Sequence, residues 1–331
     1  MNDFIRFTLS EYYEIYASDI KKLNMGHNEC YIVSDELNKY FIKVLPLDEE
    51  KKLQNEMAYI SFLSSKFCVP TIYMTKEKNR YIKTNHGLLL VEKYENGVVY
   101  DYNECPSTIL IESAYLLGNL HMISKSYSGN RVIDYCWMTS YREKEIEEIH
   151  NLLEKVSYSE SIISKKKIKE ELELKLQMVT DTTQYLPLFK NVSYGMSHGD
   201  YCCPQWIVDN DNINCVIDFT NCAEIPYVWE VFRSYLQSSQ SCNDGSFIDL
   251  NELLAYINAY NSKNKIDLSE WLIMPYIYVC WLSVSTYGYK QFLSNQNHTY
   301  LKIASWRTNI CQTVLHNLNE IENAIKELFY E

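Results

Sequence analysis

The chain has 331 residues, 47% of them hydrophobic and 22% charged, and a formal net charge of −12. This length suffices for one large domain or two lobes, and this apolar share excludes an intrinsically disordered chain. The acidic excess argues against a nucleic-acid partner, because phosphate backbones bind basic surfaces, and it would attract a cationic small molecule instead.

The cysteines and the apolar segments bear on the compartment. Eleven cysteines are scattered without zinc-site spacing, and residues 1–10 carry charges where a secretory signal would be apolar. Both features predict reduced thiols in a cytoplasmic protein. The uncharged segment between Glu270 and Lys290 is interrupted by Pro275 and several polar side chains. It predicts a buried helix and no membrane span.

The first hundred residues predict short strands and one helix. The helix is expected at Leu53–Leu63, where apolar residues recur with helical spacing on one face. The segment Ser34–Asn38 has the composition of a turn between the first strands. The expected strands are Ile20–Val33, Lys39–Val44, Thr71–Met74, Arg80–Thr84 and Leu88–Tyr94.

The middle of the chain predicts helices. Ser107–Ser124 is apolar with helical spacing, and Ser140–Gln177 is rich in Glu and Lys, which is typical of one or two surface helices. After Asp218 the chain is expected to be helical to its end. The sequence shows no internal repeat and no Gly/Ser-rich linker between domains.

The most informative segment is Met196–Phe219. A short turn ends in Asp200, and two predicted strands follow, joined by the turn residues Asp209–Asn212. Asp218 comes directly after the second of these strands, so the hairpin should bring it back toward Asp200. Two converging carboxylates suit phosphoryl transfer, because one can meet an attacking hydroxyl while the other holds Mg²⁺ against a phosphate.

This segment resembles the catalytic half of the aminoglycoside phosphotransferase and choline kinase family, within the protein-kinase-like fold. The family pattern is His-Gly-Asp, then an Asn, then a strand pair that ends in Ile-Asp-Phe or Ile-Asp-Trp. Gln205 stands where the family usually has Asn. The resemblance implies an α+β, bilobal fold, with a small β-rich N-lobe at 1–95 and a large helical C-lobe at 96–331. The matching residues are His198, Gly199, Asp200, Ile217, Asp218 and Phe219.

The resemblance also implies roles in the transfer of a nucleotide γ-phosphate to an alcohol. Asp200 would accept or orient the hydroxyl proton, and His198 would be a scaffold residue of its loop. Asp218 and Gln205 would hold Mg²⁺, which binds at short oxygen distances and tolerates little distortion. If the longer Gln205 amide does not reach the metal, the chain would bind a nucleotide or ligand without transfer.

The donor, ATP or GTP, would be bound by the N-lobe. Lys43 ends a strand where the family has its phosphate-binding lysine, and Glu56 would hold that lysine in place, with Glu49 and Glu50 as rival partners. The further nucleotide-binding residues that the resemblance implies are Gly26 and Asn28 in a covering loop, and Glu92 and Tyr94 in a hinge at 92–95 whose backbone groups would read the base.

The acceptor is expected to be a hydroxylated small molecule that is cationic. Carboxylates would suit the amines of an aminoglycoside, and aromatic rings would suit a quaternary ammonium through cation–π contacts. An aminoglycoside, choline or ethanolamine, and a sugar or amino-acid alcohol all remain open, as does a non-catalytic scaffold on this fold. Glu230 also stands where the family has an Asp that braces the catalytic loop. The candidate substrate residues are Glu224, Glu230, Asp244 and Trp271.

Overall fold

The computed structural model describes residues 1–23, 29–129, 139–158 and 164–330, and the chain divides into two compact units. Unit 1 comprises Met1–Val99, Tyr127–Asn130 and Gln205–Cys222. Unit 2 comprises Tyr100–Ser126, Arg131–Pro204 and Ala223–Glu331. The expected lobe boundary after residue 95 stays a prediction. Unit 1 also contains the later segment Gln205–Cys222, which a single boundary does not describe.

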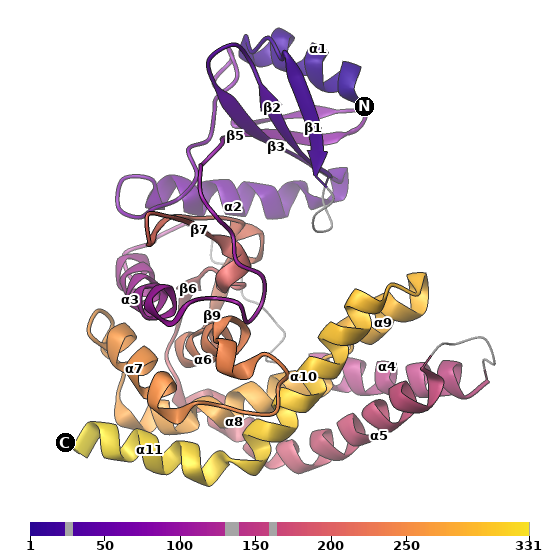
Figure 1. The fold of residues 1–331 in the computed structure, drawn as a ribbon, viewed down its shortest axis with the longest axis vertical. Helices are drawn as coiled ribbons and strands as arrows, with labels where there is room; N and C mark the ends of the chain where they lie inside the picture. The colour runs from indigo at the N-terminus through magenta and orange to yellow at the C-terminus, as the bar shows by residue number, and fades with distance from the viewer. Residues whose placement is uncertain (24–28, 130–138, 159–163, 331) are drawn as a thin grey trace. The chain divides into compact units, whose positions relative to one another are not determined.

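Unit 1 is built on a five-stranded antiparallel sheet with the strand order β1-β2-β3-β5-β4 (Figure 1). A separate two-stranded hairpin, β7–β8, comes from the late segment of the chain. The elements of unit 1 are α1 (Asn2–Tyr13), β1 (Asp19–Leu23), β2 (Glu29–Ser34), β3 (Lys39–Leu45), α2 (Glu50–Leu63), β4 (Tyr81–Thr84), β5 (Gly87–Lys93), β7 (Trp206–Asp209) and β8 (Asn212–Val216).

The two faces of this sheet differ, because successive side chains of a strand point to opposite sides. Ile42 and Val44 of β3 pack with Leu9 of α1 in one buried cluster, which also holds Leu89 and Val91 of β5. The residues between them on β3 and β5 therefore face away from α1. That second face is the one on which the predicted site residues of these strands lie.

Two local features of unit 1 differ from the sequence-based expectation. Helix α1 is not among the predicted elements. Its N-cap residue, Met1, makes no side-chain capping hydrogen bond, so the usual sequence signal of a helix start is missing. Packing of the apolar face of α1 on the sheet stabilises the helix instead. Thr71–Met74 forms no regular strand. This segment pairs with β5 at one bridge, between Ile72 and Glu92. The bridge lies on the side of β5 where β4 pairs with other residues of that strand.

Unit 2 is mainly helical, with one two-stranded sheet, β6–β9. Every residue of its central helix, α6, is buried. The elements of unit 2 are α3 (Ser107–Ser124), α4 (Thr139–Tyr158), α5 (Lys165–Thr182), β6 (Tyr194–Ser197), β9 (Ala223–Pro226), α6 (Tyr227–Ser238), α7 (Leu250–Asn261), α8 (Leu268–Val284), α9 (Tyr287–Asn295), α10 (His298–His316) and α11 (Leu318–Tyr330).

Two expectations for this part of the chain are corrected. The chain is not wholly helical after Asp218, because β9 pairs with β6 before α6 begins. The charged stretch forms α4 and α5 as expected, but it is more than a solvated surface: Lys175 is fully buried and donates to the Leu282 carbonyl at 3.0 Å. The β-rich N-terminal sheet and the helical remainder confirm the α+β class.

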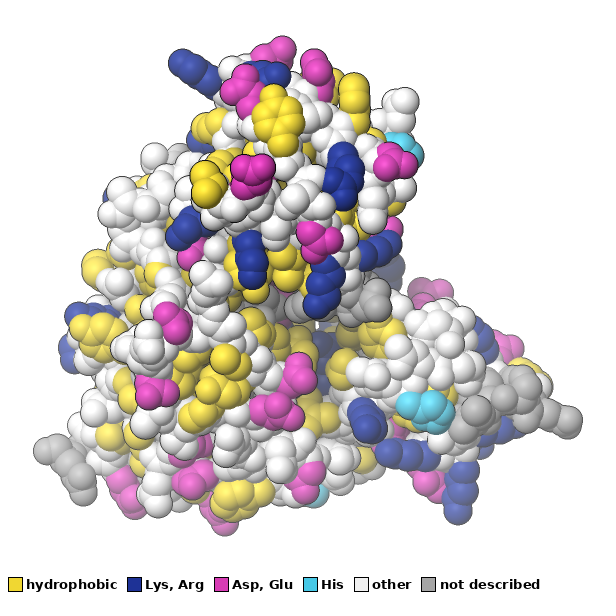
Figure 2. Space-filling view, turned by 45° about the horizontal axis from the view of Figure 1, so that its top comes forward, with side chains coloured by type: hydrophobic (Ala, Val, Ile, Leu, Met, Phe, Trp, Pro, Cys, Tyr) yellow, Lys and Arg dark blue, Asp and Glu magenta, His cyan; other side chains and the backbone are white. Residues whose placement is uncertain are grey.

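Two observations concern the apolar helices and the surface. Within the described residues, no helix is both long and apolar enough to cross a membrane. On the face shown in Figure 2, acidic side chains are spread among the basic ones.

Candidate active site

In unit 1 the predicted site residues form a cluster of one lysine and three carboxylates. The Lys43 Nζ lies 3.8 Å from Glu56 Oε1, 3.6 Å from Glu92 Oε1 and 3.5 Å from Asp218 Oδ1. Lys43 and Glu92 point away from the α1 side of the sheet, Glu56 comes from α2, and Asp218 follows β8. Four elements of one compact unit therefore converge on a single ammonium group.

The cluster has more negative charge than positive, and most of it is buried. Lys43, Glu56 and Glu92 are each at most 7% exposed, while the Asp218 side chain is 40% exposed. Burial raises the pKa of Glu56 to about 7, against the opposing effect of Lys43. Burial lowers the pKa of Lys43, but Glu92, Asp218 and Glu56 outweigh it and hold that pKa well above its usual value. The ammonium therefore stays charged.

This donor set fits a divalent cation with phosphates. The buried atoms Lys43 Nζ, Glu56 Oε1 and Glu92 Oε1 have no hydrogen-bond partner, so polar capacity is left for a ligand. No group of three metal-ligating side chains occurs among the residues that the structure describes. Mg²⁺ does not need such a cage, because it is commonly held by one or two carboxylates together with substrate phosphates.

The β7–β8 hairpin positions Asp218 as its sequence predicts. Asn210 and Asp211 at the turn have φ angles of 50° and 59°, the left-handed values that a tight hairpin turn requires. At the base of the hairpin, the Ile217 N–H donates to the Gln205 carbonyl at 2.9 Å. The backbone of Gln205 is thereby fixed beside the residue that precedes Asp218.

Thr220 is a member of this cluster that the sequence analysis missed. Its hydroxyl lies 2.5 Å from Asp218 Oδ1 and 3.3 Å from Glu56 Oε2, and so links the two carboxylates. Asp218 itself has a φ of 64°, a left-handed conformation that is uncommon outside glycine and that recurs at functional sites. The available signal was the position of Thr220 two residues after the motif aspartate.

The other nucleotide-binding predictions are only partly accessible. Gly26 and Asn28 lie outside the described residues. Tyr94 donates its backbone N–H to the Lys39 carbonyl at 3.3 Å, so that group is engaged within unit 1. Glu92, expected for its backbone in the hinge, also contributes its side chain to the lysine cluster. The predicted hinge is therefore connected directly to Lys43.

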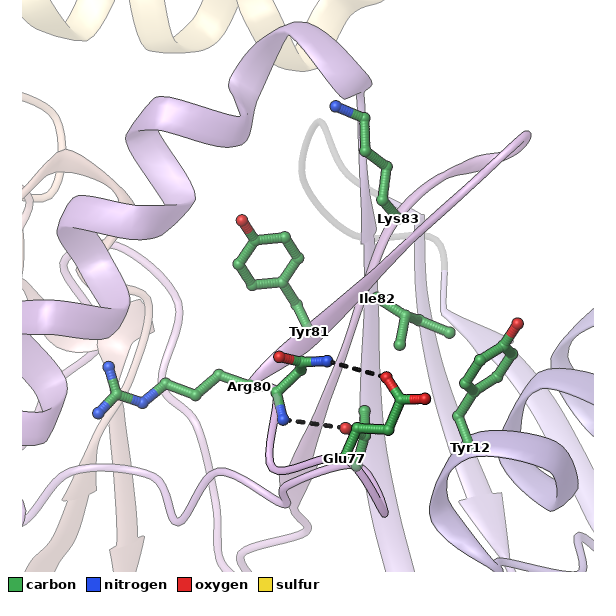
Figure 3. A pocket seen from close by; sticks show the side chains of 8 residues that line it. Tyr12, Glu77, Arg80, Tyr81, Ile82 and Lys83 are labelled. Atoms are coloured by element: carbon green, nitrogen blue, oxygen red, sulfur yellow. Dashed lines mark hydrogen bonds between the residues drawn. The ribbon is translucent and has the colours of Figure 1, made fainter.

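Unit 1 also contains a pocket of about 350 Å³ that shares no residue with this cluster. Figure 3 shows Tyr12, Arg80 and Lys83 among its lining side chains. Asn79 and Glu77, which also line it, are joined by a hydrogen bond. Its lining carries both charges and does not extend to Lys43.

In unit 2, Asp200 lies on a loop that Glu230 holds in place. Glu230 Oε1 accepts the Gly199 N–H at 2.5 Å and lies 3.5 Å from the Tyr201 N–H. Gly199 has a φ of 81°, which favours glycine and turns its N–H toward Glu230. His198 is fully buried and its Nδ1 accepts the Asp200 N–H at 3.2 Å, consistent with the expected scaffold role.

The buried His121 side chain contacts Glu230. His121 Nε2 lies 3.2 Å from Glu230 Oε2 and also contacts the Ser197 hydroxyl, while its Nδ1 lies 2.7 Å from the Tyr260 hydroxyl. Burial lowers the pKa of His121, so the ring is neutral at pH 7. Burial raises the pKa of Glu230, but the hydrogen bond with His121 and the nearby His121, His198 and Arg233 side chains together outweigh burial and lower that pKa. Glu230 is therefore an ionised acceptor for the loop, and His121 holds its second carboxylate oxygen in place.

Asp200 itself is paired with Arg233, another residue that the sequence analysis did not assign to the site. The Arg233 Nη2 contacts Asp200 Oδ1, and the Asp200 side chain is 22% exposed. Glu230 and Arg233 are both buried, so they do not form a charged pair on the surface of α6. Instead, both residues support the loop that carries Asp200. Their three-residue spacing on one helix was the signal.

The predicted substrate residues lie in different environments. Glu230 and Trp271 are fully buried and offer no surface to a solute, because Glu230 braces the loop and Trp271 packs edge-on against Tyr260. Their expected substrate contacts are therefore corrected. Asp244 caps a local turn by accepting the Ser246 N–H at 2.8 Å, and Glu224 lies half-buried on β9 opposite Met196.

Comparisons with known proteins agree with this geometry. Residues 19–268 match the profile of the phosphotransferase enzyme family. A search of the curated proteins found no match. Many solved structures match, and their low identities make the similarity one of fold, namely the kinase-like fold of these enzymes.

Three of these structures illustrate the similarity. An amicoumacin kinase in complex with AMP-PNP, Ca²⁺ and its antibiotic is 16% identical, with a TM-score of 0.67 over 94% of this chain and 93% of its own. A microcompartment-associated aminopropanol kinase is 13% identical, with a TM-score of 0.66 over 97% and 99% of the two chains. The choline kinase of Streptococcus pneumoniae is 15% identical, with a TM-score of 0.60 over 97% and 99%.

Proposed function

The chain belongs to the phosphotransferase enzyme family, and on that premise we propose that it transfers the γ-phosphate of a nucleoside triphosphate to a hydroxyl group of a small molecule. The observation that carries the proposal is the Lys43 cluster, in which one charged ammonium is held by Glu56, Glu92 and Asp218. This combination of a strand lysine, a helix glutamate and a metal-binding aspartate is the recurring equipment of kinase-type phosphoryl transfer.

Each residue has a definite part in the proposed reaction. Lys43 binds phosphate oxygens, and Glu56 and Glu92 keep its ammonium charged and oriented. Asp218 and Gln205 would hold Mg²⁺, which when bound neutralises phosphate charge. The acceptor oxygen forms a bond to the γ-phosphorus, the bond to the bridging oxygen breaks, and the nucleoside diphosphate leaves. Asp200 takes the hydroxyl proton, and its gain comes mainly from positioning.

The braced loop of unit 2 supports the role of Asp200. Glu230 fixes the Gly199 N–H, and His198 fixes the Asp200 N–H, so the backbone that carries the carboxylate is held at two points. A base that is preoriented in this way loses little entropy when the acceptor hydroxyl arrives. The choice between ATP and GTP, the use of Mg²⁺ and the alcohol acceptor are parts of this proposal.

The test compares Asp200→Asn with Asp218→Asn. Asp200→Asn should lower kcat roughly 100- to 10,000-fold, the usual contribution of a general base, while nucleotide binding persists. Asp218→Asn should weaken Mg²⁺-dependent nucleotide binding. Nucleotide affinity by calorimetry and nucleoside diphosphate release across an acceptor panel are the two measurements.

The matched control is Asp181→Asn, which removes an exposed carboxylate on α5 and should leave both measurements unchanged. Wild-type turnover in Asp200→Asn or Asp218→Asn would refute the assignment of these residues. A wild-type protein that binds nucleotide but phosphorylates no acceptor would favour the binding-only alternative over transfer.

A further inference from the structure

Unit 2 contains a cavity that shares no residue with the predicted site. Its volume is about 210 Å³, and it is lined by residues at the end of α3, just before and at the start of β6, at the start of α6 and between α7 and α8. Sites for drug-sized molecules measure roughly 300–1,000 Å³, so a ligand of this cavity is small. The lining includes Lys125, Ser193, Tyr227, Asn264 and Lys265.

The lining of this cavity carries positive charge. Lys125 and Lys265 are both exposed, and among the described residues neither ammonium group forms an ion pair. The described lining includes no carboxylate. Glu270 contacts the lining residue Ser193, but its two carboxylate oxygens accept the Ser193 N–H at 2.5 Å and the Ser193 hydroxyl at 2.8 Å. The charge of the lining therefore favours an anion.

Asn264 gives the cavity wall an acceptor without a donor. The residue is 1% exposed, and its Nδ2 donates to the Tyr260 hydroxyl at 2.7 Å. Its Oδ1 is buried and has no hydrogen-bond partner. A buried acceptor of this kind costs stability until a donor reaches it. Because Asn264 lines the cavity, an O–H or N–H group of a bound ligand supplies the missing donor.

A chain of hydrogen bonds leads from Asn264 to the Gly199 N–H. The neutral His121 ring has one N–H, and its Nε2 lies 3.2 Å from the Glu230 carboxylate, which only accepts, so the proton is on Nε2. His121 Nδ1 then accepts from the Tyr260 hydroxyl at 2.7 Å, and the Tyr260 oxygen accepts from Asn264. Glu230 in turn accepts the Gly199 N–H. The chain therefore has a fixed direction, and Asn264 Oδ1 is its open end.

Tyr227 makes a second connection between the cavity and this chain. It lines the cavity, and the centre of its ring lies 4.5 Å from that of the His121 ring. The ring is also packed closely on β6, because a Cβ at Gly195 would lie 1.7 Å from the Tyr227 hydroxyl oxygen. A ligand in the cavity thus meets a closely held ring that packs directly on the histidine.

We infer that this cavity binds a small oxyanion that carries a hydrogen-bond donor, of the size of inorganic phosphate, and that the bound anion stabilises the loop that carries Asp200. Lys125 and Lys265 attract the charge, and Asn264 Oδ1 accepts the O–H. Hydrogen bonds in a chain strengthen one another, so a donor at Asn264 strengthens the bond that holds Gly199. Binding is independent of the proposed function, and only an effect on turnover rests on that function.

The first experiment measures binding by calorimetry, with Mg²⁺ and a non-hydrolysable nucleotide present to occupy the proposed donor site. Inorganic phosphate keeps an O–H donor at pH 7, whereas sulfate has acceptors only. Phosphate should therefore bind roughly 5- to 100-fold more tightly than sulfate, which leaves the acceptor unpaired. Glycerol 3-phosphate, measured alongside, distinguishes a phosphate ester from the free ion as the preferred ligand.

The two exposed lysines allow a variant that leaves the core intact. Lys125→Gln combined with Lys265→Gln should weaken phosphate binding roughly 2- to 30-fold, the effect of losing two exposed ion pairs. Lys302→Gln removes an exposed positive charge from α10 and should bind phosphate as the wild type does. Equal affinity of the wild type for phosphate and sulfate, or phosphate binding that the double variant leaves intact, overturns the site.

The second experiment follows the loop by hydrogen exchange. Phosphate should slow exchange of the Gly199 N–H several-fold in the wild type, because its bond to Glu230 opens less often. Tyr260→Phe removes the hydroxyl that links Asn264 to His121. This variant should still bind phosphate, since Tyr260 does not line the cavity, but phosphate should no longer slow the exchange. The lysine double variant should show less slowing than the wild type at a phosphate concentration that half-saturates the wild type.

The outcomes separate this inference from the proposed function. Slowed exchange at Gly199 upholds the inference even if no acceptor is phosphorylated, in which case only the transfer proposal fails. Phosphate binding without slowed exchange, or slowing that persists in Tyr260→Phe, overturns the link to the loop. Where transfer is measured, phosphate should raise kcat and leave nucleotide affinity unchanged. Inhibition by phosphate in competition with nucleotide, without protection of Gly199, overturns the inference and leaves the proposed function standing.

Discussion

The predicted site residues of the two units have different local electrostatics. In unit 1 a single ammonium, Lys43, lies among three carboxylates, while in unit 2 the guanidinium group of Arg233 contacts the single carboxylate Asp200. The first part suits metal and phosphate, because its excess charge is negative around one fixed cation. In the second, one guanidinium and one carboxylate balance each other.

The largest effect is expected from removing the cation of unit 1. Lys43→Met leaves buried carboxylates without their partner and should lower the free energy of unfolding by about 3–5 kcal/mol. Adding Glu56→Gln should restore part of this loss, because the two residues act as a pair. Chemical denaturation measures both variants. Lys51→Met, on the exposed side of α2, is the control, and equal destabilisation in Lys43→Met and Lys51→Met would contradict the buried cluster.

The second effect concerns pH and the support of unit 2. The pKa of His121 is lowered below 6.5 in the folded protein, so below about pH 6.5 the unfolded chain binds more protons than the folded one. Stability from this group is therefore full above that pH and is lost as pH falls, by at most about 1.4 kcal/mol per pH unit. His121→Gln should flatten the stability profile between pH 6.5 and 5. His316→Gln, an exposed residue, should not, and an unchanged slope in His121→Gln would count against a neutral buried ring.

A smaller effect tests the link between the carboxylates of unit 1. Thr220→Val removes the hydroxyl that lies 2.5 Å from Asp218 Oδ1, at a cost of about 1 kcal/mol. Nucleotide affinity in the presence of Mg²⁺ should therefore fall several-fold. Thr220→Ser retains the hydroxyl and should stay close to wild type. If Val and Ser variants bind nucleotide alike, Thr220 does not position Asp218.

The smallest effect is expected at Gln205. If its amide reaches the metal, Gln205→Asn should leave phosphorylation intact or raise it, because only the side-chain length changes. The measurement is substrate phosphorylation over a range of Mg²⁺ concentrations, for wild type and variant side by side. Turnover that appears only in the Asn variant would mean that the natural chain binds its ligands without transfer.

The sequence predicted those parts of the site that short-range chemistry encodes. The hairpin turn at Asn210 and Asp211, the position of Lys43 on β3 and that of Glu56 on α2 follow from turn propensity and periodicity, and the structure has them as expected. Motif matching added Asp200 and Asp218 as predicted site residues. Their assigned roles remain predictions until the variants above are measured.

The rest could not be read from the sequence because it depends on tertiary contacts. His121, Thr220 and Arg233 are ordinary residues of a helix or loop, and only packing reveals that each contacts a predicted site carboxylate. Trp271 and Glu230 were expected at a binding surface because aromatic and acidic residues suit cationic ligands, yet both are buried. Composition identifies the available groups, whereas burial decides which of them a ligand can reach.

The composition of unit 1 also has a consequence for the order of events during synthesis. Lys43, Glu56 and Glu92 leave the ribosome together, but Asp218 and the β7–β8 hairpin follow more than a hundred residues later. At 5–20 residues per second this delay is on the order of ten seconds. For that time the nascent sheet has its lysine and two glutamates but no aspartate, so the charge cluster stays incomplete until the hairpin has been translated and has docked.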